Sequence, residues 1–161
     1  MMPRSHSTLR RSLLWGGLAV LASVAPAIAQ SANFDGITLS TYPPSTAEVT
    51  GRTVGTYALG NIAGRDRDGK PCTGFADTNP DHILVLQNDF PTLTVQVTSG
   101  RDTTLLIQGP DNNTIRCGQD ISRRDLDAIV QGEDWRTGTY RIWVGTHDQG
   151  QRFNYTLSVS E

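Results

Sequence analysis

The sequence predicts an all-β protein, an antiparallel β-sandwich of the jelly-roll-like type with eight to nine short strands. The first observation is alternation in residues 138–145, where side chains at every second position share one face of an extended chain. Tyr140, Ile142 and Val144 lie on one face, and Thr139, Arg141 and Trp143 on the other. The second observation is that short apolar segments recur roughly every ten residues between turn-forming residues, which is typical of a sandwich.

The N-terminus has the features of a secretory signal peptide, predicted over residues 1–29. Arg4, Arg10 and Arg11 precede an apolar run from Leu13 to Val24, and the small residues Ala27 and Ala29 suit cleavage before Gln30. An uncleaved membrane anchor is the rival interpretation, and the paired arginines leave general and twin-arginine export both open. The sequence therefore predicts a periplasmic or extracellular protein that is not inserted in a membrane after cleavage.

The processed chain would have 161 − 29 = 132 residues, enough for one domain with its own core. Removing three arginines leaves 14 − 3 = 11 basic residues against 16 acidic ones, a net charge of −5. Because the basic residues form no run, the composition disfavours a nucleic-acid partner or an anionic membrane. We expect a monomer.

The N-terminal segments of the predicted domain show weaker strand patterns than the later ones. Residues 30–49 are predicted to be an N-terminal arm or edge strand, because Ile37 and Leu39 alternate with polar residues while Pro43 and Pro44 cannot sit in a central strand. The sandwich domain is predicted over residues 50–161. Residues 53–59 can form a strand, and residues 60–71, with three glycines, a surface loop.

The following strands are predicted over residues 72–76, 82–87, 92–98, 103–108, 114–117, 138–145 and 152–160. Leu93, Val95 and Val97 are expected to point inward between outward threonines. The last two strands are expected to be neighbours that share one core. Residues 120–128 are the single helical candidate, with Ser122 as its cap.

Three segments in order, Asp102–Asp111, Gly138–Gly145 and Tyr155–Val159, resemble the final strands of the bacterial pre-peptidase C-terminal (PPC) domain family. The resemblance covers roughly residues 50–161, and residues 72–75 and 80–82 resemble the start of a cysteine-bearing branch. It implies a jelly-roll-like sandwich, usually a non-catalytic appendage of secreted enzymes, sometimes with calcium.

Cys72 and Cys117 are the two cysteines, and an even count in an exported chain favours a disulfide. The closed loop of 117 − 72 + 1 = 46 residues would contribute about 4 kcal/mol of stability. Zinc binding is the alternative, but His82 and His147 are the only histidines left after processing and complete a poor ligand set.

Two kinds of ligand site are conceivable from side-chain chemistry. Trp135 and Trp143, with Arg141 nearby, could stack on sugar rings if exposed. Alternatively, Trp143 covers a sheet face with Arg141 as its cation–π neighbour, and Trp135 closes the core. Calcium candidates are carboxylates in or near predicted loops, with solvated acidic surface as the alternative: Asp66, Asp68, Asp120, Asp125 and Asp127.

No residue set has the pattern of an active site, because His82 and His147 lie in unrelated segments without a nucleophile context. The sequence predicts no enzymatic activity and no cofactor. The leading hypothesis is an exported module that binds a protein or glycan partner through its loops. The alternatives are a calcium-assisted carbohydrate-binding module and a small secreted hydrolase.

Overall fold

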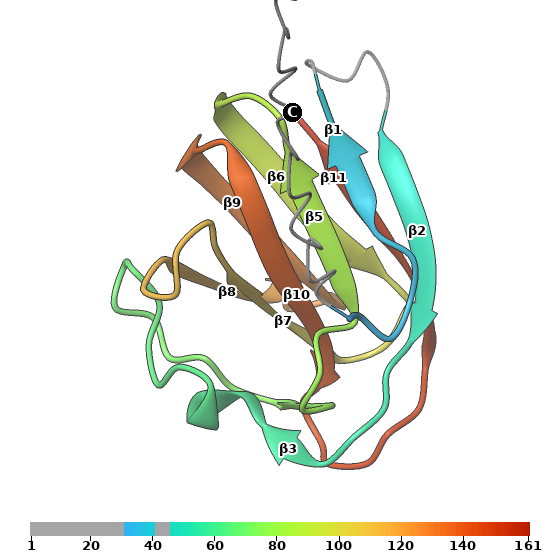
Figure 1. Ribbon diagram of the computed structural model, residues 1–161. Helices are drawn as coiled ribbons and strands as arrows, with labels where there is room; N and C mark the ends of the chain where they lie inside the picture. Colours follow the sequence, from blue (N-terminus) through green and yellow to red (C-terminus); the bar gives the residue numbers. More distant parts are fainter. Residues whose placement is uncertain (1–30, 41–45) are drawn as a thin grey trace, which may run out of the picture.

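The computed structural model describes residues 31–40 and 46–161 and shows an all-β fold (Figure 1). The predicted signal peptide lies outside these residues. The described residues form one 3₁₀ helix, Leu59–Asn61, and eleven strands, of which β3 and β4 have two residues each. The strands are β1 (Ile37–Leu39), β2 (Ala47–Arg52), β3 (Tyr57–Ala58), β4 (Phe75–Ala76), β5 (His82–Leu86), β6 (Phe90–Thr98), β7 (Thr103–Gln108), β8 (Ile115–Ser122), β9 (Asp125–Trp135), β10 (Gly138–Thr146) and β11 (Asn154–Ser160).

The strands follow one continuous path in the order β1-β5-β10-β7-β8-β9-β6-β11-β2. Strand β8 pairs with β7 through its first half and with β9 through its second half, so it passes from one layer to the other. The two ends of the path, β1 and β2, lie side by side, which nearly closes the sheet (Figure 1). All strand pairs are antiparallel except β1 with β5.

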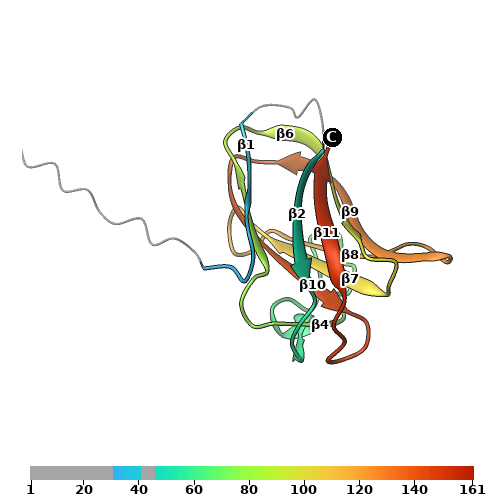
Figure 2. The same cartoon turned by 90° about the vertical axis from the view of Figure 1, so that its right-hand side faces the viewer.

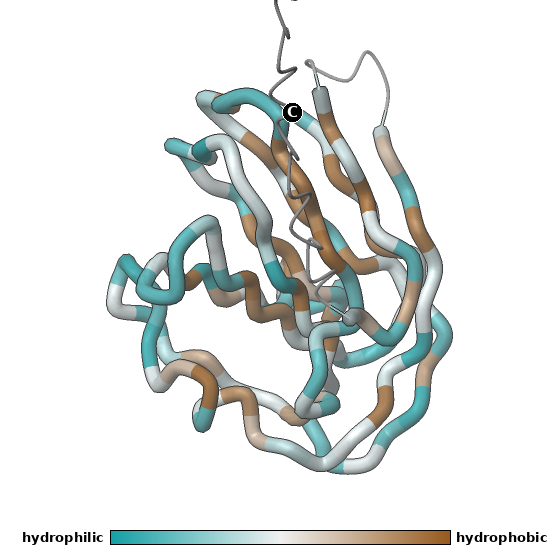
Figure 3. Tube along the Cα trace, viewed as in Figure 1, coloured by the Kyte–Doolittle hydropathy of each residue, from teal (hydrophilic) through white to brown (hydrophobic). Residues whose placement is uncertain are grey.

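The main core lies between the two layers and contains the inward residues that the alternation predicts. Tyr140, Ile142 and Val144 of β10 share it with Tyr155, Leu157 and Val159 of β11, which confirms the shared core. A second cluster, which includes Leu59, Cys72 and Trp143, lies under the loop that precedes β4. In Figure 3 hydrophobic residues lie along the strands, and hydrophilic residues gather in the connections.

Two sequence predictions are wrong. Residues 120–128 form no helix but the end of β8, a two-residue turn and the start of β9, with Ser122 paired to Asp125. Strands β10 and β11 share a core but are not neighbours: β10 pairs with β4, β5 and β7, and β11 with β2 and β6. The connection over residues 147–153 therefore crosses from one layer to the other.

The predicted disulfide between Cys72 and Cys117 is present, with the Cα atoms 5.4 Å apart. It ties the loop before β4 to β8. Within residues 31–40 and 46–161, no helix has the length and hydrophobicity needed to cross a membrane.

Candidate binding surface

The hairpin formed by β8 and β9 projects beyond the body of the protein, as the orange hairpin at the right of Figure 2 shows. Its turn is braced by Ser122, whose Oγ accepts the N–H groups of Arg124 and Asp125 at 3.3 and 3.1 Å. The Asp125 carboxylate in turn accepts the N–H of Asp127 at 3.2 Å. These local bonds fix the turn and limit the conformations that it can adopt.

The base of the hairpin is anchored by Asp127, which is only 6% exposed. Its carboxylate accepts the Ser99 N–H at 2.9 Å, the Ser99 hydroxyl at 2.6 Å and the Gly100 N–H at 3.1 Å. The next residue, Ala128, donates its N–H to the Thr103 hydroxyl at 2.9 Å. Because a carboxylate that accepts several N–H groups makes strong hydrogen bonds, the hairpin is held firmly to the β6–β7 turn.

The hairpin tip, defined as residues 121–126, exposes both apolar and cationic side chains. Ile121 and Leu126 are 37% and 40% exposed, and among the described residues Tyr57 is the one other large hydrophobic side chain exposed to this extent. They flank the turn on opposite strands. Arg123 and Arg124 form the turn, are exposed, and make no ion pair with a described carboxylate.

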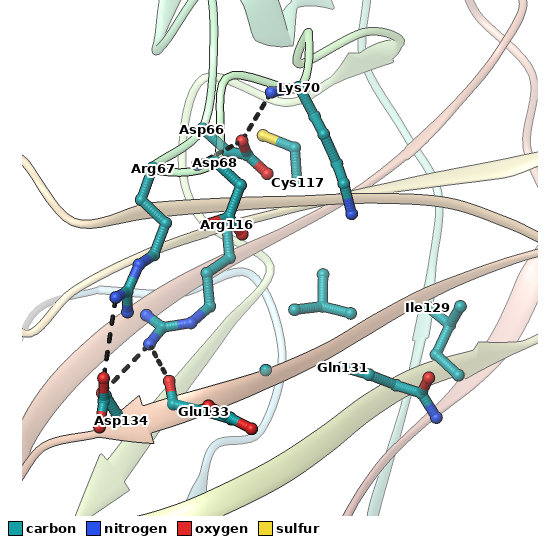
Figure 4. A pocket seen from close by; sticks show the side chains of 12 residues that line it. Asp66, Arg67, Asp68, Lys70, Arg116, Cys117, Ile129, Gln131, Glu133 and Asp134 are labelled. Carbon is teal, nitrogen blue, oxygen red and sulfur yellow. Dashed lines mark hydrogen bonds and ion pairs between the residues drawn. The ribbon is translucent and has the colours of Figure 1, made fainter.

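A charged groove, shown in Figure 4, begins beside the hairpin where β8 separates from β9. Strand β8 pairs with β9 from Gln119 onward and lies apart from it up to Gly118, where a Cβ would overlap the carbonyl oxygen of Ile129. The groove has a volume of about 270 Å³ between the loop of residues 66–70 and β9, and a more open hollow of about 450 Å³ continues from Lys70 to Asp120 at the hairpin. The groove and this hollow therefore run along the base of the hairpin as far as Asp120, the residue before the tip.

Arg116 forms the floor of the groove and is 4% exposed. Its guanidinium carbon lies 4.2 Å from the centre of the Trp135 ring, a cation–π contact. Its Nη2 donates to the carbonyls of Glu133 and Asp134 at 3.0 and 3.2 Å. Burial, together with the nearby Arg67 guanidinium, lowers the pKa of Arg116. Two carbonyls and an aromatic face thus contact this buried cation directly, and the Asp68 and Asp134 carboxylates attract it from a greater distance.

The wall of the groove carries both signs of charge. Arg67 lies 3.9 Å from the Asp134 carboxylate in an exposed ion pair, which contributes little stability. Asp134 has a positive φ of 57°, a conformation that non-glycine residues adopt rarely. The Asp66 carboxylate accepts the N–H groups of Asp68 and Lys70 at 2.9 and 2.8 Å and so shapes the loop.

The aromatic candidates are buried rather than displayed. Trp135 is 0% exposed and Trp143 is 5% exposed, so the structure places both indoles in the core instead of on a sugar-binding surface. Arg141 donates to the Asn112 side chain. The arginine that stacks on a tryptophan is Arg116, which sequence reasoning missed because Arg116 and Trp135 belong to different strands.

The calcium candidates fall in separate places. Asp66 and Asp68 lie in the groove loop, Asp120 and Asp125 in the hairpin, and Asp127 at its base. In the part of the chain that the structure describes, no three His, Cys, Asp or Glu side chains are grouped to hold a metal ion. Calcium binding stays an untested alternative.

His82 is part of the core, with 1% of its surface exposed. Its Nδ1 lies 2.6 Å from the Asp35 carbonyl, which can only accept, so Nδ1 carries the proton. Its Nε2 then accepts the Tyr155 hydroxyl at 2.8 Å. Burial lowers the pKa of His82 and raises that of Tyr155. Both ring nitrogens are engaged, whereas His147 lies exposed in the turn after β10.

Comparison with known proteins adds a weak structural likeness. No family model matches the chain, so the resemblance to PPC domains stays a prediction. No curated protein matches it either. Among solved structures it is similar to PliG of Aeromonas hydrophila, a periplasmic inhibitor of g-type lysozyme, with 17% identity and a TM-score of 0.38. The match covers 78% of this chain and 97% of that one. Similarity at this level does not identify a shared function.

Proposed function

We propose that this protein is an exported, non-catalytic module that binds a protein partner through the hairpin tip and the adjoining groove. The observation that carries the proposal is the hairpin tip, which exposes Ile121 and Leu126 on a turn braced from within and anchored at its base. Exposed apolar side chains on a rigid element favour protein binding, because little conformational entropy is lost on association.

Export is supported by the predicted signal peptide and by the disulfide, since disulfides persist mainly in oxidising compartments. The described cysteines are both in this bond, so neither is available as a nucleophile. The His82 ring is occupied by the Asp35 carbonyl and the Tyr155 hydroxyl, which leaves it no free nitrogen for proton transfer. These features favour binding over hydrolysis.

A protein partner is favoured over a glycan by the exposed side chains. Sugar recognition on sandwiches relies on exposed aromatic faces, and both tryptophans considered for that role are buried. The tip instead offers branched aliphatic side chains and arginines, and arginine is enriched at protein interfaces.

A site-specific photo-crosslinking amino acid tests the proposal in cells that make the protein. Placed at Leu126, it should yield a discrete crosslinked protein, and the yield should fall at least fivefold when Ile121 is also changed to Ser. The control position is Glu48, an exposed residue of β2 in the layer next to β11. Equal crosslinking from both positions, or none from Leu126, would contradict the proposed function.

A further inference from the structure

We infer that the partner presents a cleft lined by carboxylates, and that the hairpin tip inserts into this cleft as a cationic finger. The inference rests on the proposed function and names the chemistry of its partner. It is carried by the shape of the hairpin and by the distribution of charge along it.

The shape is convex and narrow. Figure 2 shows the hairpin projecting away from both layers, and its turn consists of two residues between the paired Ser122 and Asp125. A two-residue hairpin presents few atoms at its end, so a flat partner surface would contact little of it. A concave surface can contact the turn and both flanking strands at once.

The two arginines of the hairpin tip lie at its end, beside one exposed carboxylate, Asp125. Asp127 is buried against the β6–β7 turn, whereas Asp125, within the tip, is exposed and accepts the N–H of Asp127. Asp120 lies opposite Ala128, beyond the tip toward the body. The guanidinium groups of Arg123 and Arg124 are left at the end, without an ion pair to any described carboxylate.

A guanidinium that enters a cleft loses water and needs a partner of opposite charge. Carboxylates meet this need best, because they accept two parallel N–H groups from one arginine. Ile121 and Leu126 flank the turn and would lie against the apolar walls of the cleft, where burial of each stabilises the complex. Both features of the tip are therefore satisfied by one acidic, apolar-walled cleft.

An extended anionic surface fits less well. Residues 31–161 carry 14 − 3 = 11 basic and 16 acidic side chains, so the body of the protein is negative. A membrane of anionic lipid or a nucleic acid would repel that body while attracting two arginines. A cleft presents its carboxylates to the tip alone.

The test varies charge while the crosslinker stays at Leu126. The reversed variant carries Arg123→Glu and Arg124→Glu, and the neutral variant carries Arg123→Gln and Arg124→Gln. The matched control carries Arg52→Glu and Arg152→Glu, which gives the same change in net charge at exposed arginines outside the hairpin. Thermal unfolding checks that each variant is folded. Partner peptides are identified by mass spectrometry, and phosphatidylglycerol vesicles serve as the membrane probe.

Charge reversal should lower the crosslinking yield at least tenfold, neutralisation several-fold, and the control should leave it unchanged. The crosslinked peptides should lie in a concave part of the partner that bears at least two carboxylates. An unchanged yield in the reversed variant, peptides from a basic or neutral surface, or binding to the vesicles would overturn the inference and leave the proposed function standing. Loss of all crosslinking in the unaltered protein would overturn both.

Discussion

At the scale of single residues, the burial of Asp81 has the clearest energetic consequence. Its carboxylate is 0% exposed and accepts N–H groups from Val144 at 2.8 Å and Asn33 at 3.2 Å. Burial nevertheless dominates and raises the pKa of Asp81 to about 7, above its ordinary value of 3.8. The folded protein therefore retains a proton on Asp81 in a pH range where the unfolded chain has released it.

Asp81 should make the protein less stable as pH rises from about 4 to about 7. Because the folded state binds more protons in this window, its stability falls by about 1.4 kcal/mol per pH unit from this group alone. His82 acts in the opposite direction below its ordinary pKa of 6.5, since burial lowers its pKa and favours the neutral ring. Denaturant unfolding of Asp81→Asn and the unaltered protein at several pH values isolates the Asp81 contribution. Parallel pH profiles of the two proteins would contradict it.

Residue burial was predictable from sequence where strands alternate regularly. Leu93, Val95 and Val97 point inward as predicted, because period-two spacing fixes their face. The Arg116–Trp135 contact was not predictable, since it depends on which strands meet across the groove. The residues that neighbour Trp135 in the sequence are compatible with a place in a turn and with a place in the core.

At the scale of elements, the segment of residues 120–128 shows why local patterns mislead. A Ser hydroxyl that accepts the N–H three residues later caps a helix in one context and closes a hairpin turn in another. Ser122 makes this bond to Asp125, but β9 continues along β6 from Phe90 to Gln96, so the long-range ladder decides the outcome. Helical propensity over nine residues is too weak to compete with that pairing.

The anchor of the hairpin should depend on Asp127. Asp127→Ala removes the acceptor of the Ser99 and Gly100 hydrogen bonds and leaves partly buried donors unpaired. We expect a loss of about 1–3 kcal/mol in the free energy of unfolding and faster amide exchange across residues 119–128. Asp120→Ala, on the exposed part of the same hairpin, is the control and should change stability by less than about 0.5 kcal/mol. Unaltered exchange in Asp127→Ala would show that the ladder alone holds the hairpin.

At the scale of the whole molecule, the sequence predicted the fold class but not the order of the strands. Alternation and turn spacing identify strands, whereas the partner of each strand depends on connections that can return to either layer. The connection between β10 and β11 crosses the sandwich, so two strands adjacent in sequence face each other across the core. Strand β8 likewise pairs with a different strand in each layer, with β7 up to Gly118 and with β9 from Gln119. The groove lies where β8 and β9 are apart.

The disulfide links these long-range features and should contribute substantially to stability. It closes the loop of residues 72–117, which contains β4 to β7 and the start of β8. In the loop before β4, the Arg67 N–H donates to the Ile115 carbonyl of β8 at 3.0 Å, and the Leu59 N–H donates to the Gly74 carbonyl at 2.9 Å, which joins the two ends of the loop. In the chain-entropy model, loss of the cross-link destabilises the protein mainly by enlarging the conformational freedom of the unfolded chain.

Cys72→Ala combined with Cys117→Ala should lower the free energy of unfolding by about 4 kcal/mol, because the cross-link no longer restricts a 46-residue loop. The main core between the layers contains neither cysteine, so the variant should still fold at moderate temperature. Denaturant melts of the variant, and of the unaltered protein with and without a reducing agent, measure the effect. Reduced protein and double variant should agree closely. A loss of less than about 1 kcal/mol in both would mean that the unfolded chain is already restricted in this region without the disulfide.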